Sequence, residues 1–214
     1  MPERFCFSGC GKMEICVIVI SVYEKSRIRI FYIQGDHMKE LGYNIFLIGF
    51  MGAGKSTISS CLHSSYGMEI LEMDQDIEKR EGKKISDIFA EQGEEYFRKL
   101  ETELLLELRN RKNLVVSCGG GTPLRSCNVE AMRQGGKVIF LTATPETVLE
   151  RVKDSHDRPV IENHKNVPFI ASLMEKRREA YESAADLQIP TDGRSAEEIC
   201  QELMQRLEES EAVR

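Results

Sequence analysis

A glycine-rich segment that ends in lysine and serine constrains the fold of this chain more than any other feature. Residues 49–56 read GFMGAGKS, which fits the phosphate-binding pattern G-x-x-x-x-G-K-[ST]. The apolar run at 44–48 suits a strand, and the segment at 57–62 suits a helix that turns Ile58 and Leu62 inward. Strand, loop and helix in this order are the context of a phosphate-binding P-loop. A simple glycine-rich turn with a surface lysine is the alternative, which this context disfavours.

The chemistry of this loop suits a nucleoside triphosphate. Glycines allow successive backbone N–H groups to point into one concave nest, and the helix that starts near Lys55 adds the positive end of its dipole. We expect Lys55 to reach the β- and γ-phosphates and the Ser56 hydroxyl to bind Mg²⁺. The expected ATP-binding residues of the loop are Gly52, Ala53, Gly54, Lys55, Ser56 and Thr57.

Length, charge and cysteine content exclude several classes of protein. The 214 residues suit one compact domain, and a net charge of −6 with both signs interspersed argues against a nucleic-acid partner. The seven cysteines are odd in number and include no C-x-x-C pair, so reduced thiols in a cytoplasmic protein are favoured over a zinc site. No run approaches the roughly 18 apolar residues that a membrane helix needs, so we expect no membrane partner.

Residues 1–37 differ from the rest of the chain. The apolar run at 15–20 resembles one strand of a hairpin, which alone would be marginally stable. A secretory signal is disfavoured because no small-residue cleavage site follows that run. The segment at 34–37 can be encoded by a purine-rich sequence of the kind that binds ribosomes, just before Met38. We therefore predict that translation starts at Met38 and that the domain comprises residues 38–214.

Strands and helices alternate regularly after the P-loop. Further strands are predicted at 69–73, 113–117, 136–141 and 187–190. Helices are predicted at 77–111 in two or more pieces, 124–134, 146–152 and 169–185, with a polar loop at 156–168 and a last helix capped by Ser195 and Glu198. This alternation predicts an α/β fold with a parallel sheet, helices on both faces, and a ligand site beyond the carboxyl ends of the strands.

Two aspartates follow the second predicted strand. Asp74 and Asp76, at i and i+2 just past the strand end, are expected to point into one crevice. One carboxylate would hold Mg²⁺ through water and the other would bind an acceptor hydroxyl, with helix N-capping as the alternative. Further along, Arg98 is available for a substrate carboxylate and would be steadied by Glu101 at i+3. A solvated charged helix face is the alternative for Arg98.

Three glycines and two arginine-containing segments complete the candidate site. Gly119 to Gly121 follow a buried strand and could offer N–H groups to a small polar ligand, or form a simple tight turn. Ser117, at the end of that strand, could hold a Mg²⁺-bound water. Arg158 lies in the polar loop, where closure over phosphate would resemble an arginine finger, although an exposed loop arginine is the default. Of the run Lys176-Arg177-Arg178, at least one side chain must be solvated.

In their order and approximate spacing these motifs resemble those of the shikimate kinase family. The resemblance covers about 38–210 and rests on the P-loop at 49–57, Asp74-x-Asp76, Phe97-Arg98-x-x-Glu101, Gly119-Gly120-Gly121, Arg158-Pro159 and Arg177-x-x-x-Tyr181. It implies a three-layer P-loop NTPase fold with a five-stranded parallel sheet, a helical region that binds shikimate, and a lid. It also implies a monomer that transfers the γ-phosphoryl group of ATP to the 3-hydroxyl of shikimate, on the way to chorismate and the aromatic amino acids.

The resemblance implies a role for each matched residue. Asp76 would bind the shikimate hydroxyls and accept the 3-hydroxyl proton, and Arg158 would contact the transferring phosphate. The carboxylate would pair with Arg98 and Arg177, although the neighbouring Arg178 could share the role of Arg177. The catalytic residues would be Lys55, Asp76 and Arg158, and the backbone of Gly119, Gly120 and Gly121 would bind the hydroxyls. Mg²⁺ would be bound by Ser56, Asp74 and Ser117, and adenine would be contacted by Arg151 and Arg194. Glu179 and Ala180 depart from the family, which usually has a proline and an aliphatic residue there.

Other kinases and a non-catalytic module are the competing hypotheses. A gluconate kinase also needs partners for a carboxylate and hydroxyls, but such kinases carry a different acceptor segment after the second strand. A nucleoside-monophosphate kinase would need to read a second base, and nothing in this sequence is typical of that. A regulatory nucleotide-binding module would tend to lose catalytic side chains, and all of them are present here. Turnover would distinguish these hypotheses.

Overall fold

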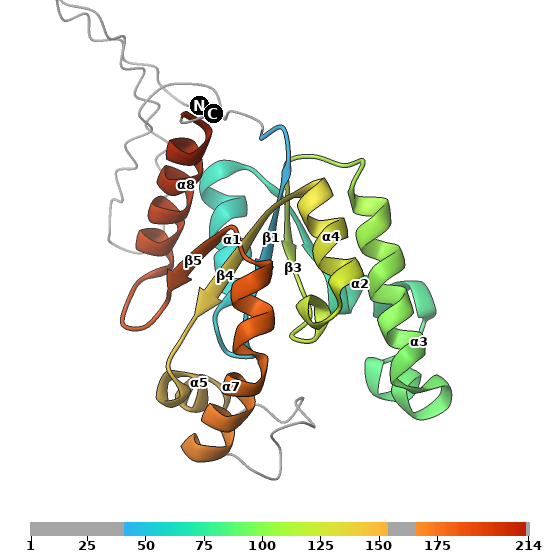
Figure 1. Ribbon diagram of the computed structural model, residues 1–214. Helices are drawn as coiled ribbons and strands as arrows, with labels where there is room; N and C mark the ends of the chain where they lie inside the picture. The colour runs from blue at the N-terminus through green and yellow to red at the C-terminus, as the bar shows by residue number, and fades with distance from the viewer. Residues whose placement is uncertain (1–40, 154–165, 213–214) are drawn as a thin grey trace, which may run out of the picture. The chain divides into compact units, whose positions relative to one another are not determined.

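The computed structural model describes residues 41–153 and 166–212, and its centre is a five-stranded parallel sheet (Figure 1). The strands are β1 (Asn44–Ile48), β2 (Glu69–Glu72), β3 (Leu114–Ser117), β4 (Gly136–Thr142) and β5 (Leu187–Pro190). Across the sheet their order is β2-β3-β1-β4-β5. The five strands expected from the sequence are therefore confirmed, with ends that agree to within about one residue.

The strand before the P-loop lies at the centre of the sheet because it is apolar on both faces. Phe46 pairs in parallel register with Val116 of β3. The side chains of Phe46 and Ile48 pack into one hydrophobic cluster, and those of Ile45 and Leu47 pack into another on the opposite face. A strand buried on both faces reads as a continuous apolar run, which is what the sequence shows at this point.

Helices cover both faces of the sheet, so the chain has three layers. Residues of α3 (Ile85–Leu108) and α4 (Ser126–Gly135) join the cluster of Phe46, as do those of α2 (Met73–Glu81). Residues of α1 (Lys55–Tyr66) and α8 (Ala196–Ala212) join the cluster of Ile45 on the other face, as Figure 1 shows. A third cluster joins α5 (Pro145–Val152) to α7 (Val167–Ala184). The predicted three-layer α/β fold is confirmed.

Three helices begin at different residues from those that the sequence predicts. α2 begins at Met73, directly after β2, whereas the sequence predicts a helix from about residue 77. α7 begins at Val167 because Pro168 suits the first turn of a helix, and the side chain of Asn166 caps it by accepting a backbone N–H at 3.0 Å. Leu124, expected to open the helix at 124–134, instead ends a short 3-10 turn, η1 (Thr122–Leu124), and α4 starts only at Ser126.

The capping box at the start of α8 and the divided helix before β3 are both confirmed. Ser195 Oγ accepts from the backbone N–H of Glu198 at 3.2 Å, and Glu198 Oε2 accepts from the N–H of Ser195 at 2.9 Å. Gly93 interrupts α3 with φ 83°, a conformation that glycine adopts without strain.

Within the described ranges, no helix is both long enough and apolar enough to cross a membrane. Cys61, Cys118, Cys127 and Cys200, the cysteines of the described part, are free thiols as predicted. The predicted start at Met38 and Arg158 of the polar loop lie outside the described residues.

Candidate active site

The P-loop connects β1 to α1 as the motif predicts. Gly54, the residue before α1, has φ 99°, and a Cβ at Gly49 would lie 2.6 Å from the carbonyl oxygen of Leu141 in β4. Both positions therefore require glycine. Lys55 curls back over the loop, where its Nζ donates to the carbonyl oxygens of Gly49 at 2.8 Å and Phe50 at 3.2 Å. The loop thus holds its lysine at the entrance to α1, where the positive end of the helix dipole lies.

The remaining P-loop residues lie at the first turn of α1. Ser56 and Thr57 are exposed there, so their hydroxyls are accessible to a ligand. Among the described residues, no side chain caps the N-terminus of α1, and the first N–H groups of a helix have no partner within it. This arrangement is typical of an anion site, because backbone N–H groups and the dipole both favour negative charge.

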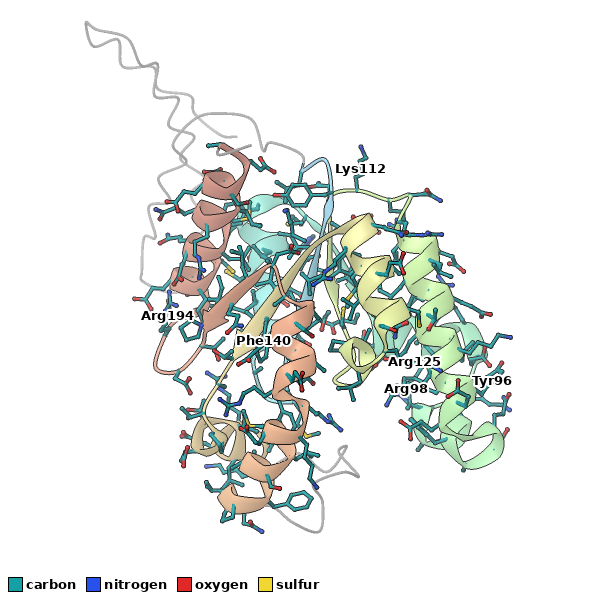
Figure 2. The ribbon with its side chains drawn as sticks, in the orientation of Figure 1. Tyr96, Arg98, Lys112, Arg125, Phe140 and Arg194 are labelled. Atoms are coloured by element: carbon teal, nitrogen blue, oxygen red, sulfur yellow. The ribbon has the colours of Figure 1, made fainter. Side chains whose placement is uncertain are left out.

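The two arginines expected beside adenine contact the carboxyl end of β5 and the residues after it. Arg151 of α5 donates to the carbonyl oxygen of Gly52 at 3.0 Å and to that of Thr191 at 2.9 Å, so it ties the P-loop to the segment after β5. Arg194 donates to the carbonyl oxygen of Pro190 at 3.1 Å. Figure 2 shows Arg194 next to β5 and α8, well separated from Arg98. Both arginines therefore bind backbone carbonyls at or just after the end of β5.

The two aspartates lie in the first turn of α2, which begins at Met73. Residues two apart in a helix point in different directions. A Cβ at Gly119 would lie 3.0 Å from Asp74 Oδ1. Asp76 Oδ2 lies 2.6 Å from Arg80 Nε, but this buried oxygen accepts no hydrogen bond within the described part of the chain. That the two carboxylates serve one ligand crevice stays a prediction.

A group of charged side chains surrounds the carboxyl end of β3. Burial raises the pKa of the Cys118 thiol; the charge of Lys55 acts against this, while those of Glu101, Asp74 and Glu72 add to it. A Cβ at the next residue, Gly119, would lie 2.9 Å from Glu101 Oε1 and 3.0 Å from Asp74 Oδ1, so these two carboxylates are close to this strand end. Glu72 pairs in register with Ser117, which is itself buried. In the sequence, only its place at the end of a predicted strand marks Glu72 as a possible site residue.

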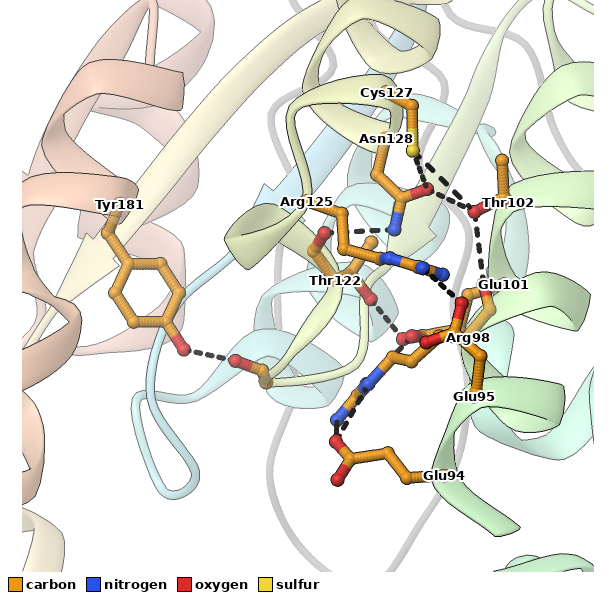
Figure 3. A network of polar contacts seen from close by, with 11 residues as sticks. Glu94, Glu95, Arg98, Glu101, Thr102, Thr122, Arg125, Cys127, Asn128 and Tyr181 are labelled. Carbon is orange, nitrogen blue, oxygen red and sulfur yellow. Dashed lines mark hydrogen bonds and ion pairs between the residues drawn. The ribbon is translucent and has the colours of Figure 1, made fainter.

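A buried carboxylate holds Arg98, as Figure 3 shows. Glu101 is fully buried, and its Oε2 accepts from Arg98 Nη1 at 2.7 Å while Oε1 accepts from Thr122 Oγ1 at 2.5 Å. Burial raises the pKa of the Glu101 carboxyl, and the hydrogen bonds from Thr122 and Arg98 act in the opposite direction. Glu94 binds the outer side of the same guanidinium at 2.9 Å. The prediction that Glu101 steadies Arg98 is confirmed.

The three glycines form the turn between β3 and η1, and each faces a different polar group. A Cβ at Gly121 would lie 2.5 Å from both terminal nitrogens of Arg98. At Gly119 it would lie 2.9 Å from Glu101 Oε1, and at Gly120 it would lie 3.9 Å from Arg177 Nη1. We call Gly119 to Gly121 the triple-glycine turn. Its lack of side chains lets arginines approach the backbone from α3 and from α7.

Replacing Gly121 by alanine should raise the KM for the acceptor substrate about tenfold or more, since the new methyl group would displace the guanidinium of Arg98 and weaken a charge-assisted contact. The KM for ATP should not change. Steady-state kinetics of Gly121→Ala beside Gly42→Ala, where a Cβ meets nothing within 4 Å, measure this. An unchanged acceptor KM in Gly121→Ala would show that Arg98 does not bind the acceptor.

Of the adjacent arginines on α7, one faces the site and the other faces solvent. The Arg177 guanidinium lies 5.8 Å from the centre of the Phe50 ring in the P-loop and close to Gly120. Arg178 forms an exposed ion pair with Glu175 at 2.6 Å. Adjacent side chains in a helix point about 100° apart, so Arg177 and Arg178 do not face the same way.

Comparison with known proteins agrees with this site. A family model described as shikimate kinase matches residues 51–208. A shikimate kinase of Persephonella marina is 46% identical over 164 residues, covering 77% of this chain and 98% of that protein. The structure of a shikimate kinase from Acinetobacter baumannii in complex with shikimate is 34% identical, with a TM-score of 0.73 over 78% of this chain and 94% of that one. A gluconokinase structure from Sinorhizobium meliloti is 19% identical, with a TM-score of 0.52, and shares the fold alone. The chain belongs to the shikimate kinase family.

Proposed function

We propose that this protein transfers the γ-phosphoryl group of ATP to the 3-hydroxyl of shikimate, giving shikimate 3-phosphate and ADP. The observation that carries the proposal is the approach of two arginines to the triple-glycine turn, Arg98 at Gly121 and Arg177 at Gly120, beside a P-loop. Shikimate carries one carboxylate and three hydroxyls. Two arginines suit the carboxylate, and a turn of glycine N–H groups with a nearby aspartate suits the hydroxyls.

We assign the acceptor hydroxyl to Asp76 and keep Asp74 for Mg²⁺. Asp76 Oδ2 is buried and accepts no hydrogen bond from the described residues, so this oxygen is available to a substrate hydroxyl. Arg80, which lies 2.6 Å from Oδ2 and also pairs with Glu107 of α3 at 2.7 Å, would hold the carboxylate in place. In phosphoryl transfer, Asp76 would orient the hydroxyl and accept its proton late.

Charge stabilisation of the transferring phosphoryl group would come from the P-loop and from the lid. Lys55 and the N–H groups of Gly52, Ala53 and Gly54 would bind the β- and γ-phosphates, with Ser56 and Thr57 at the start of α1. We also assign Arg158 to the transferring phosphate, and this assignment rests on the family motif alone. Arg151 and Arg194 would flank adenine, which their place around residues 190–194 supports.

Mg²⁺ fits the oxygen donors found at the ends of β2, β3 and the P-loop. Ser56 lies at the first turn of α1, Ser117 ends β3, Glu72 ends β2, and Asp74 lies two residues further along. Such hard oxygen donors, used together with water and phosphate oxygens, are typical of Mg²⁺ sites in kinases. The ion would offset the charge of the β- and γ-phosphates. Glu72 joins Ser56, Asp74 and Ser117 in the proposed set because it pairs in register with Ser117.

Arg177→Ala should raise the KM for shikimate about tenfold to a hundredfold, whereas Arg178→Ala should change it by less than about threefold. The reason is that Arg177 faces Gly120 and Phe50, while Arg178 lies in an exposed ion pair with Glu175. Initial-rate kinetics with shikimate varied at saturating ATP compare the two variants directly. Equal effects would mean that both arginines bind the carboxylate.

A coupled ADP-release assay with Mg·ATP tests the activity, with gluconate as the comparison substrate. Turnover with shikimate and not with gluconate is the expected result. Turnover with gluconate would favour the gluconate kinase hypothesis, and ATP binding without turnover of either would favour a regulatory module. We also propose that the enzyme is a cytoplasmic monomer, which the free thiols of the described cysteines and the family resemblance support.

A further inference from the structure

A buried tyrosine that the proposed mechanism does not use contacts the triple-glycine turn. Tyr181 of α7 is 2% exposed, and its ring stacks on Phe140 with centroids 5.1 Å apart and an interplanar angle of 10°. Its hydroxyl donates to the carbonyl oxygen of Gly120 at 2.5 Å, the contact at the left of Figure 3. Stacking thus fixes the ring, and the hydroxyl is the group that reaches the turn.

This hydrogen bond sets the direction of a backbone N–H group. The carbonyl of Gly120 and the N–H of Gly121 belong to one planar trans peptide unit, so they point in opposite directions. When Tyr181 binds the carbonyl on the α7 side, the N–H of Gly121 must point away from α7. The same peptide unit leads to Gly121, whose α-carbon faces the Arg98 guanidinium on α3.

The carbonyl of Gly120 depends on Tyr181 as a hydrogen-bond donor, whereas the carbonyls of Gly119 and Gly121 have backbone donors. The carbonyl of Gly119 accepts from the N–H of Thr122 at 3.1 Å, and that of Gly121 accepts from the N–H of Leu124 at 3.1 Å. The carbonyl of Gly120 has only Tyr181 as a partner among the described residues. A peptide unit between two glycines rotates at little steric cost, so without that bond it could turn over.

We propose that Tyr181 is a positioning residue for the acceptor substrate: its hydroxyl holds the Gly120 carbonyl and thereby aims the Gly121 N–H at the shikimate hydroxyls. The inference rests on the proposed function and deepens it. Arg177 precedes Tyr181 by four residues, so both side chains lie on one face of α7. One helix therefore places a partner for the carboxylate and fixes the donor for the hydroxyls.

The protonation state of Tyr181 suits a donor. Burial raises the pKa of its phenol, while the positive charges of Arg177 and Arg98 act in the opposite direction. The net direction is upward, so the hydroxyl keeps its proton at neutral pH and continues to donate to Gly120.

Tyr181→Phe tests the proposal because it removes one hydroxyl and keeps the ring that stacks on Phe140. Loss of a neutral hydrogen bond and a freer peptide unit should raise the KM for shikimate about threefold to tenfold. The KM for ATP should stay constant and kcat should change by less than about twofold. Tyr43→Phe is the matched control, since Tyr43 precedes β1 at the opposite end of the sheet and should leave both KM values unchanged.

Hydrogen exchange of the turn gives a second readout that needs no turnover. The amides of the triple-glycine turn should exchange faster in Tyr181→Phe than in the wild type and in Tyr43→Phe, because the middle peptide unit becomes free to rotate. An unchanged shikimate KM with unchanged exchange would overturn the positioning role. So would an equal rise in both KM values with general loss of thermal stability. Absence of wild-type turnover with shikimate would instead overturn the proposed function.

Discussion

Replacing Lys55 by alanine is expected to reduce kcat about a thousandfold or more, because the variant loses the cation nearest to the β- and γ-phosphates. The fold should persist, since the Nζ contacts of Lys55 are to loop carbonyls and the side chain is only half-buried. The assay is ADP release at saturating ATP and shikimate, combined with thermal unfolding to confirm that the variant is folded.

Lys99→Ala is the matched control for this experiment. Lys99 lies on α3 with its side chain 67% exposed, in a loose ion pair with Glu103 at 3.6 Å. Exposed pairs of this kind contribute little, so its loss should change neither kcat nor stability by a measurable amount. If Lys55→Ala retained wild-type turnover while folded, the P-loop would not be the site of phosphate transfer.

Asp76→Asn is expected to lower kcat with shikimate by about 10²- to 10⁴-fold. The amide has the size of the carboxylate but carries no charge and accepts no proton. Asp76 Oδ2 is buried and accepts no hydrogen bond from the described residues, which leaves it available to the acceptor hydroxyl. Asp74→Asn, two positions away in the same helical turn, should instead raise the Mg²⁺ concentration that gives the half-maximal rate, so each variant serves as the control of the other.

Thermal unfolding separates a catalytic effect from a structural one. The Asp76–Arg80 ion pair is partly exposed, so its loss should lower the unfolding temperature of Asp76→Asn only slightly. The loss of kcat should therefore occur in a folded protein. A kcat close to that of the wild type in Asp76→Asn would remove Asp76 from the acceptor site.

Most of the fold follows from the sequence because the signals for it are local. The apolar run of β1, the P-loop glycines and the capping box of Ser195 and Glu198 each act within a few residues. The regular alternation of strands and helices then leaves one sheet with helices on both faces. These predictions needed no knowledge of contacts between distant residues.

The site was harder to predict because it depends on where helices begin and which way they face. A start of α2 at Met73 turns Asp76 towards Arg80 and leaves Asp74 at the triple-glycine turn, a difference that spacing alone does not reveal. The contact of Tyr181 with Gly120 joins residues 61 positions apart. Its motif was visible in the sequence, but the role of its hydroxyl required the packing of α7 against the sheet.

The position of phosphate on the product is the most direct test of the proposed activity. The full chain would be incubated with Mg·ATP and shikimate, and the product would be examined by phosphorus and proton NMR. We expect a single phosphate ester whose phosphorus couples to the proton on carbon 3 of shikimate, formed in step with ADP. Phosphate on another carbon, or ADP accompanied only by inorganic phosphate, would contradict transfer to the 3-hydroxyl.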